Sequence, residues 1–219
     1  MIEVINYTDE IRESTFVSTI KSAWSTVHKL RPDLPEDIKI HFTDKGIVPG
    51  LATGGYAYAL DTINIAIDLN EKDTSKVKHD LTATILHEAF HLSMKYTGET
   101  GPFSLLDRVI QEGAATIFAI EYADSSAGRL YGDYKSEGNE RLQEWLRFAS
   151  DPLNQVLTRE DYSHFAFRDP LDDTRWKLYK LGTWIVTNYI KTQSMDINDF
   201  SSADVQHIIL ELKSSKPIH

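Results

Sequence analysis

The sequence predicts an α+β protein that is mostly helical, with a small β-sheet ahead of its main helices. Between about residues 38 and 68, apolar and polar side chains alternate, as in strands with one buried face. From about residue 75 to residue 212, apolar side chains instead recur every three or four positions, as on helices that pack against a core. With 219 residues, 41% of them hydrophobic, the chain is expected to form a single domain over residues 1–219.

The first expected elements are a helix and three strands. Residues 9–30 carry apolar side chains at helical spacing, and the turn-forming segment RPDLPED ends this pattern. IKIHFT at 38–43 predicts a strand, and GIVPGLATGG at 46–55 has the glycines of a flexible loop. YAYAL at 56–60 and INIAID at 63–68 predict two more strands, which would pair as a hairpin or form one longer bent strand.

Two helices are expected next, joined by a short GETGP turn. The first is predicted over about 75–97, and Gly98 is the residue expected to end it. The second is predicted over 104–122, where Ser104 stands three residues before Asp107, a capping-box-like pair. The short turn would let the second helix fold back antiparallel to the first.

The C-terminal part is predicted to be helical from about 137 to 212. After a crossing rich in glycine and aspartate, the spacing predicts a helix at 137–150 and a short one from Thr158. Two further helices are predicted at 175–191 and in the serine-capped segment SSADVQHIILELK. No repeat or linker interrupts this pattern, which favours one domain.

Composition and charge restrict the partners and the location. The net charge of −10, without a dense basic cluster, would repel a phosphate backbone or an anionic lipid surface, so nucleic acid is not expected as a partner. The longest apolar run, AATIFAI at 114–120, is too short for an integral membrane segment. The N-terminus lacks the features of a secretory signal, so a cytoplasmic protein is expected, although a chain with its signal removed would look the same.

The segment TILHEAFHLSMKYTG at 84–98 contains the residues that predict a chemical function. The chain has no cysteine, so any metal must be held by histidine, aspartate or glutamate. On a helix, His87 and His91 project from the same face and can direct two imidazole nitrogens to one Zn²⁺. Glu88 points about a quarter-turn away, beside the metal, which is where a general base belongs. The alternative is that both histidines are ordinary residues of an amphipathic helix.

A catalytic zinc site needs a third protein ligand, and Glu112 is the best candidate. It lies on the next predicted helix, and Gly113 beside it removes a side chain where two helices would approach closely. Asp107 and Glu121 are weaker candidates, because Asp107 is better used at the helix N-terminus and Glu121 lies on a different face. The alternative for Glu112 is a solvated surface glutamate.

Three segments of the chain resemble a known group of enzymes. They are TILHEAFHLSMKYTG, LLDRVIQEGAATIFA and LYKLGTWIVTNYI, the last with a Tyr-x-x-Gly-x-x-Ile-Val pattern. His-Glu-x-x-His followed by a glutamate on a second helix resembles the gluzincin group of zinc metallopeptidases and, more specifically, a bacterial family of predicted zinc-dependent proteases of unknown role. The likeness covers roughly residues 55–212. It implies a zincin-like metallopeptidase fold with one Zn²⁺.

The resemblance also implies roles for individual residues. It makes His87, His91 and Glu112 the zinc ligands, and Glu88 the general base for attack of a zinc-bound water on a peptide bond. One position departs from the gluzincin pattern. The residue four after Glu112 is often acidic in that group but is Thr116 here, so a carboxylate that orients the histidines must come from elsewhere.

Two further features could complete such a site. Backbone groups of the strands before the zinc helix could pair with an extended peptide, and Gly54 and Gly55 would permit its close approach. Tyr179 is predicted to donate its hydroxyl to the developing oxyanion, with His164 as the second choice. The alternative is that Tyr179 is a core residue and His164 a structural one.

The sequence therefore predicts a zinc-dependent metallopeptidase that acts on a peptide or protein substrate. Two alternatives stay open. A zinc hydrolase could act on a non-peptide amide, because zinc activates water towards any carbonyl. A non-catalytic protein could keep the fold and bind a peptide or partner, although it would need the metal ligands and not the base Glu88.

Overall fold

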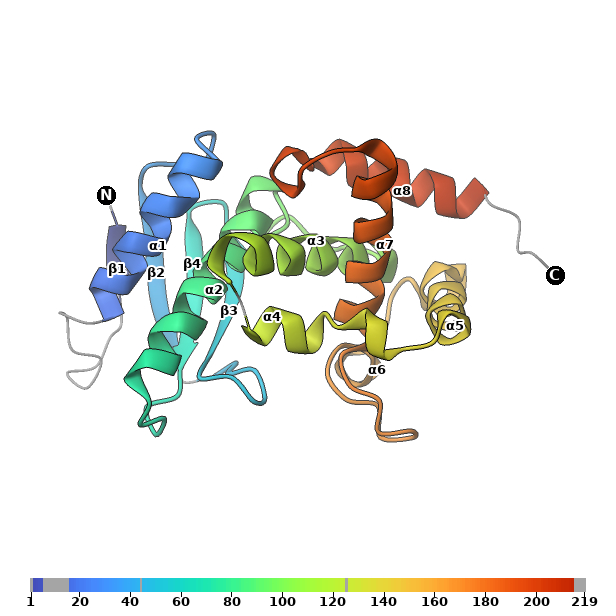
Figure 1. The fold of residues 1–219 in the computed structure, drawn as a ribbon, viewed down its shortest axis with the longest axis horizontal. Coiled ribbons are helices and arrows are strands. Elements are labelled where there is room, and N and C mark those ends of the chain that lie inside the picture. The colour runs from blue at the N-terminus through green and yellow to red at the C-terminus, as the bar shows by residue number, and fades with distance from the viewer. Residues whose placement is uncertain (1, 6–15, 44, 125, 215–219) are drawn as a thin grey trace. The chain divides into compact units, whose positions relative to one another are not determined.

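The computed structural model describes residues 2–43, except 6–15, together with 45–124 and 126–214. The chain divides into two compact units (Figure 1). The first unit is formed by residues up to 101 together with 118–127, and the second by residues 102–117 together with those from 128 onward. The predicted single domain over residues 1–219 stays a prediction. The expected α+β class, with strands ahead of most of the helices, is confirmed.

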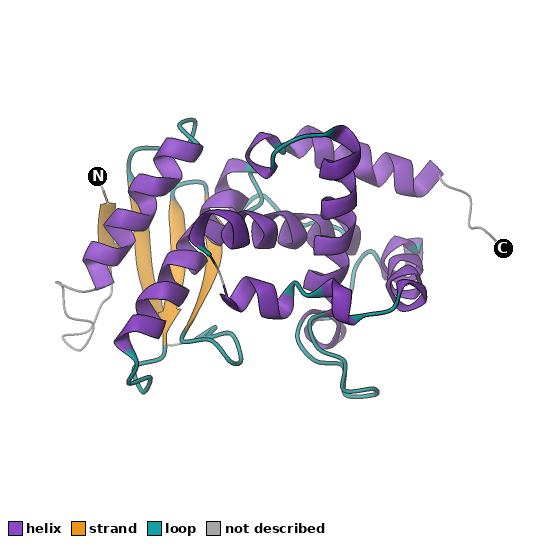
Figure 2. Ribbon diagram, viewed as in Figure 1, coloured by secondary structure: helices purple, strands orange, loops and turns teal. Residues whose placement is uncertain are grey.

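The first unit contains a four-stranded sheet with the strand order β1-β2-β4-β3 (Figure 2). β2 lies between the parallel strands β1 and β4, whereas β3 pairs antiparallel with β4 and forms an edge of the sheet. The predicted hairpin is thus confirmed. The strands are β1 (Ile2–Ile5), β2 (Ile38–Thr43), β3 (Thr53–Ala59) and β4 (Thr62–Ile67).

The sheet differs from the prediction in two places. β1 was not predicted, and it is parallel to β2 in register from Ile2 opposite Ile38. β3 starts at Thr53, so Gly54 and Gly55 belong to the strand and not to the preceding loop. Pairing with β4 explains this difference, because Gly54 and Gly55 lie opposite Ala66 and Ile65 in a ladder that the sequence does not reveal.

Two helices lie over one face of the sheet in Figure 2, α1 (Phe16–Leu30) and α2 (Thr74–Ser93). α2 packs against α1 and against strands β3 and β4. The predicted helix over 9–30 is confirmed from residue 16, and residues 9–15 of that prediction lie outside the described part of the chain. The core between these elements includes the buried side chains of Ile20, Trp24, Ile40, Ile63, Ile65, Leu81, Ile85 and Phe90.

The predicted C-terminal end of α2 is wrong by several residues. The helix ends at Ser93, and Lys95 adopts a left-handed conformation with φ of 56°. The N–H of Tyr96 then donates to the carbonyl of His91 at 2.8 Å, which satisfies one of the last carbonyl groups of the helix. Gly98, the expected stop, instead donates its N–H to the carbonyl of Ala57 on β3, at 2.9 Å.

The long helix α3 (Leu105–Ala123) begins in the second unit and ends in the first. Its predicted capping box is confirmed, because Ser104 Oγ accepts from the N–H of Asp107 and Asp107 Oδ2 accepts from the N–H of Ser104, both at 3.1 Å. α4 (Ser126–Tyr131) lies in the crossing and was not predicted. The remaining helices are α5 (Asn139–Ser150), α6 (Arg159–Ala166), α7 (Lys177–Gln193) and α8 (Ser202–Ser214), with 3-10 turns at Tyr134–Ser136, Pro152–Asn154 and Ile197–Asp199.

Within the second unit, α3 and α7 approach closely at two glycines. A Cβ atom added to Gly113 would overlap the backbone of Gly182, and one added to Gly182 would overlap the carbonyl oxygen of Val109. The predicted close approach of two helices at Gly113 is confirmed, but the partner at this glycine is α7 and not the histidine helix. The same contact explains the glycine of the Tyr-x-x-Gly pattern, which is Gly182.

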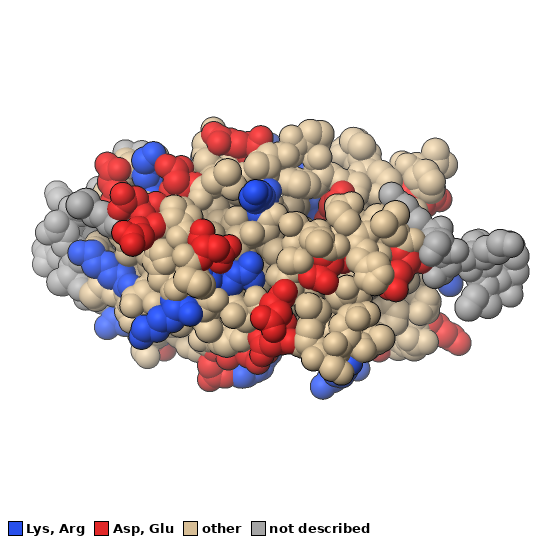
Figure 3. Space-filling view, turned by 90° about the horizontal axis from the view of Figure 1, so that it is seen from above, with Lys and Arg blue, Asp and Glu red and all other residues tan. Residues whose placement is uncertain are grey.

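Charged side chains of both signs are interspersed on the face drawn in Figure 3. The described Lys and Arg residues on that face form no continuous basic area, because Asp and Glu lie among them. None of the helices in the described ranges is long and apolar enough to cross a membrane.

Candidate metal centre

His87 and His91 lie one turn apart on α2 and are both buried, with 8% and 3% of their surface exposed. Their Nε2 atoms are 3.2 Å apart. The two rings are nearly perpendicular, at 84°, and the His91 ring also contacts the ring of Tyr96. The helix therefore holds two nitrogen atoms side by side in a site shielded from water.

This separation fits two ligands of a single zinc ion. Ligand atoms in tetrahedral positions about 2.0–2.1 Å from Zn²⁺ are about 3.3 Å from one another. Glu112 of α3 adds a carboxylate, and the candidate ligand atoms of His87, His91 and Glu112 all lie within 4.8 Å of one another. Two imidazole nitrogens and a carboxylate oxygen form a donor set that zinc takes in proteins. These three residues could therefore hold a metal ion.

The C-terminal end of α3 is anchored beside the histidine helix. Phe118 contacts Phe90, the residue before His91, with ring centroids 4.9 Å apart, and both phenylalanines are fully buried. Phe118 follows Glu112 by six residues on the same continuous helix. The aromatic contact thus attaches the C-terminal part of α3 to α2 within the first unit.

Glu88 is buried, with 6% of its surface exposed, and its carboxylate is directed to the edge strand β3. Glu88 Oε2 accepts a hydrogen bond from the backbone N–H of Ala57 at 2.8 Å. A Cβ atom at Gly55 would lie 2.5 Å from Glu88 Cγ and 2.7 Å from Oε1. Position 55 therefore requires a glycine, because a side chain there would overlap the side chain of Glu88.

Glu88 is the last of three polar residues spaced four apart on α2, all of which bind β3 or the residue before it. Asp80, 4% exposed, accepts from the N–H of Ala52 at 3.0 Å, and the hydroxyls of Thr84 and Thr53 are 2.8 Å apart. This row aligns the helix with the strand. Asp80 and Thr84 were not predicted from the sequence, although an acidic residue among apolar helix positions is a usable signal.

Part of the outer edge of β3 is already paired. Ala57 donates its N–H to Glu88 and accepts at its carbonyl from Gly98, so both groups point away from β4. Alternate residues of an antiparallel strand face the same way, so the N–H and carbonyl of Gly55 also point outward. Gly54, in contrast, packs directly against the backbone of Gly46.

The two candidates for an oxyanion donor lie on different helices of the second unit. Tyr179 of α7 is half-buried in an aromatic cluster, with its ring centroid 5.0 Å from Tyr131 and 5.9 Å from Trp176. His164 is half-buried in the last turn of α6. The cluster agrees with a packing role for Tyr179, and its role towards an oxyanion stays a prediction.

The remaining acidic candidates have separate places on α3. Asp107 caps the helix, as expected, and Glu121 is exposed. Thr116, which departs from the gluzincin pattern, is fully buried. A Cβ atom added to Gly132 would lie 2.8 Å from Thr116 Cγ2. An ionised acid at position 116 would be cut off from water, which disfavours a carboxylate there.

The fold is mostly helical α+β, with a His-x-x-x-His pair on one helix and a glutamate on the next. Together they define a protein with a candidate His-His-Glu metal centre. Residues 37–210 match the family described as "Predicted Zn-dependent protease (DUF2268)", and the chain belongs to this family. The resemblance noted in the sequence is thereby confirmed. No curated protein and no solved structure matches the chain.

Proposed function

We propose that the protein is a zinc metallopeptidase that holds one Zn²⁺ with His87, His91 and Glu112 and hydrolyses peptide bonds. The observation that carries this proposal is the group of two buried imidazoles and one carboxylate whose ligand atoms lie within 4.8 Å of one another. The family description, a predicted zinc-dependent protease, supports the same function.

Zinc bound by these residues would act as a Lewis acid towards water and towards the substrate carbonyl. Glu88 accepts the proton that the attacking water loses as its oxygen bonds to the carbonyl carbon. It then delivers a proton to the amine nitrogen as the carbon–nitrogen bond breaks. The N–H of Ala57 fixes the carboxylate through Oε2, so we assign proton transfer to Oε1.

The edge strand β3 supplies a place for an extended substrate. The outward N–H and carbonyl of Gly55 can pair with the backbone of one substrate residue, as when a peptide adds a strand to a sheet. This pairing would orient the peptide next to the carboxylate of Glu88. Tyr179 is the proposed second donor to the oxyanion, and His164 is the alternative.

Metal analysis and product mapping test the proposed function together. Native mass spectrometry of the purified chain should find about one zinc, and the protein should cleave casein or a peptide mixture. Glu88→Gln should retain the zinc and lose cleavage. A Glu88→Gln protein as active as the parent would overturn the proposed mechanism.

The same measurements separate the two alternatives. Zinc binding without turnover of any peptide or amide would indicate a non-catalytic binding protein. Turnover of small amides, without cleavage of peptides, would indicate a hydrolase of another substrate class.

A further inference from the structure

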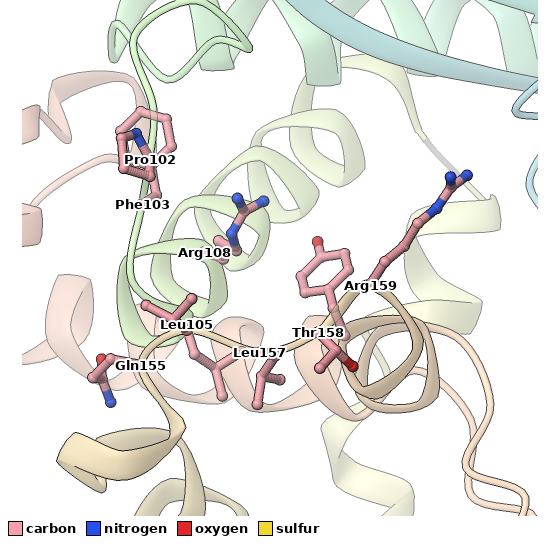
Figure 4. Close-up of a pocket in the computed structure, with 10 residues that line it drawn as sticks. Pro102, Phe103, Leu105, Arg108, Gln155, Leu157, Thr158 and Arg159 are labelled. Atoms are coloured by element: carbon pink, nitrogen blue, oxygen red, sulfur yellow. The ribbon is translucent and has the colours of Figure 1, made fainter.

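A pocket of about 320 Å³ lies in the second unit beside the start of α3 (Figure 4). Two segments far apart in the sequence line it, residues 102–108 before and within α3 and residues 155–162 before and within α6. Its volume is at the lower end of the range for ligand pockets. The pocket therefore suits one large side chain better than a whole cofactor.

The wall of the pocket is mainly apolar. Phe103, Leu105 and Leu157 contribute to it, and Leu105 and Leu157 lie together at one end in Figure 4. Val156 also lines the pocket although 89% of its surface is exposed. Water thus contacts apolar side chains that an apolar ligand group would cover at a gain in free energy.

The charged side chains of the wall are both positive. Arg108 and Arg159 line the pocket, and none of its described lining residues is acidic. This local charge is opposite to that of the whole chain, which has 33 acidic and 23 basic residues. The guanidinium of Arg108 lies over the ring of Tyr162, 5.1 Å from its centroid, which holds it at the pocket. Apolar walls with guanidinium groups suit an apolar residue that carries a carboxylate.

The pocket lies one helical turn from a proposed metal ligand. Arg108 and Glu112 are four residues apart on α3, so they share a face and are separated by about 6 Å along the helix axis. An extended peptide advances about 3.3 Å per residue, so this distance corresponds to about two substrate residues. A peptide cleaved near Glu112 could therefore reach Arg108 with its end.

We propose that this pocket binds the C-terminal residue of a peptide substrate, with an aliphatic or aromatic side chain against Phe103, Leu105 and Leu157 and the terminal carboxylate on Arg108. The protein then acts as a carboxypeptidase that removes one or two residues. This inference rests on the proposed function, because Glu112 places the pocket beside the reaction.

Binding tests the inference without requiring turnover. The Glu88→Gln protein is titrated into a fluorescent peptide that ends in leucine, either with a free carboxylate or as the C-terminal amide. Fluorescence anisotropy should give an affinity about 10-fold or more higher for the carboxylate, the value expected for a hydrogen bond to a charged group. Equal affinities would overturn the inference.

Second-site variants identify the groups responsible. Arg108→Gln in the same protein should abolish the preference for the carboxylate, and Arg108→Lys should keep part of it. Arg147→Gln, which changes an exposed arginine of α5, is the matched control and should keep all of it. Leu157→Ala should weaken binding of a peptide ending in leucine more than one ending in glycine. A carboxylate preference that survives Arg108→Gln contradicts the assignment.

Two outcomes separate this inference from the proposed function. A parent protein that holds zinc and cleaves carboxylate and amide peptides equally well would support the metallopeptidase and overturn the pocket assignment. A protein that shows the Arg108-dependent preference but neither zinc nor cleavage would leave a peptide-binding pocket and contradict the metallopeptidase. Binding of dodecanoate but of neither peptide would identify an acyl chain as the occupant and overturn the inference.

Discussion

Glu88 of the histidine helix accepts a hydrogen bond from the backbone N–H of Ala57, 2.8 Å away on the edge strand β3. The proposed general base is thus oriented by the strand that is proposed to align the substrate. Asp80 and Thr84 continue the same attachment towards the N-terminus of α2. Because three side chains hold the helix in register with the strand, a small shift of β3 would move the carboxylate.

This relationship predicts a specific effect of Gly55→Ala. The added methyl group would lie 2.5 Å from Glu88 Cγ and must displace the carboxylate. We expect peptide cleavage to fall by about 100-fold, because a displacement of about 1 Å can cost that much, while zinc binding is retained. Gly138→Ala is the matched control, since no atom lies within 4 Å of its added Cβ. Full activity of Gly55→Ala would show that this position of Glu88 is not required.

The assignment of Glu112 predicts a difference between acids of the same helix. Glu112→Ala should weaken zinc binding by about 100-fold or more. Loss of a residue that only hydrogen-bonds a metal ligand already lowers metal affinity by about 10- to 100-fold, and loss of a ligand should cost more. Asp107→Ala and Glu121→Ala should leave zinc affinity unchanged, since Asp107 caps the helix and Glu121 is exposed. Competition with a fluorescent zinc chelator measures the three affinities. Equal retention of zinc in all three variants would refute the assignment.

The contact between α3 and α7 predicts a stability effect away from the proposed reaction. Gly182→Ala adds a methyl group against the carbonyl oxygen of Val109 and the backbone of Gly113. Overpacking of this kind should lower the free energy of unfolding by about 1–3 kcal/mol. Urea unfolding followed by circular dichroism measures the loss, again with Gly138→Ala as the control. An unchanged midpoint would mean that the helices separate at little cost.

Tyr189 predicts a loss of stability in alkali. Burial, together with its hydrogen bond to Asp204 at 2.9 Å, raises the pKa of Tyr189 from 10.0 to about 12. Because the pKa is higher in the folded chain, this stabilisation is complete below pH 10 and is lost as the pH rises towards 12. Urea midpoints between pH 9 and pH 12 should therefore fall more steeply for the parent than for Tyr189→Phe. Parallel profiles of the two proteins would contradict this prediction.

Local patterns in the sequence were sufficient for several features of the fold and site. Strand β2, the hairpin and the capping box at Ser104 were predicted correctly, because alternation and capping depend on residues a few positions apart. The placement of His87 and His91 on one helix face has the same origin, since four residues complete about one turn. The sequence by itself therefore determined the class of fold and the pair of histidines.

Only the tertiary structure decided how these elements are used. Gly98 does not end α2, and its N–H instead pairs with β3. Gly55 lies in a strand because β3 pairs with β4, where Gly55 is opposite Ile65. The bond between Glu88 and Ala57 spans 31 residues, and Gly113 finds its partner on α7. Such contacts join segments that are far apart in the sequence, and no local periodic pattern indicates which segments will meet. They arise only when burial of apolar faces brings the segments together.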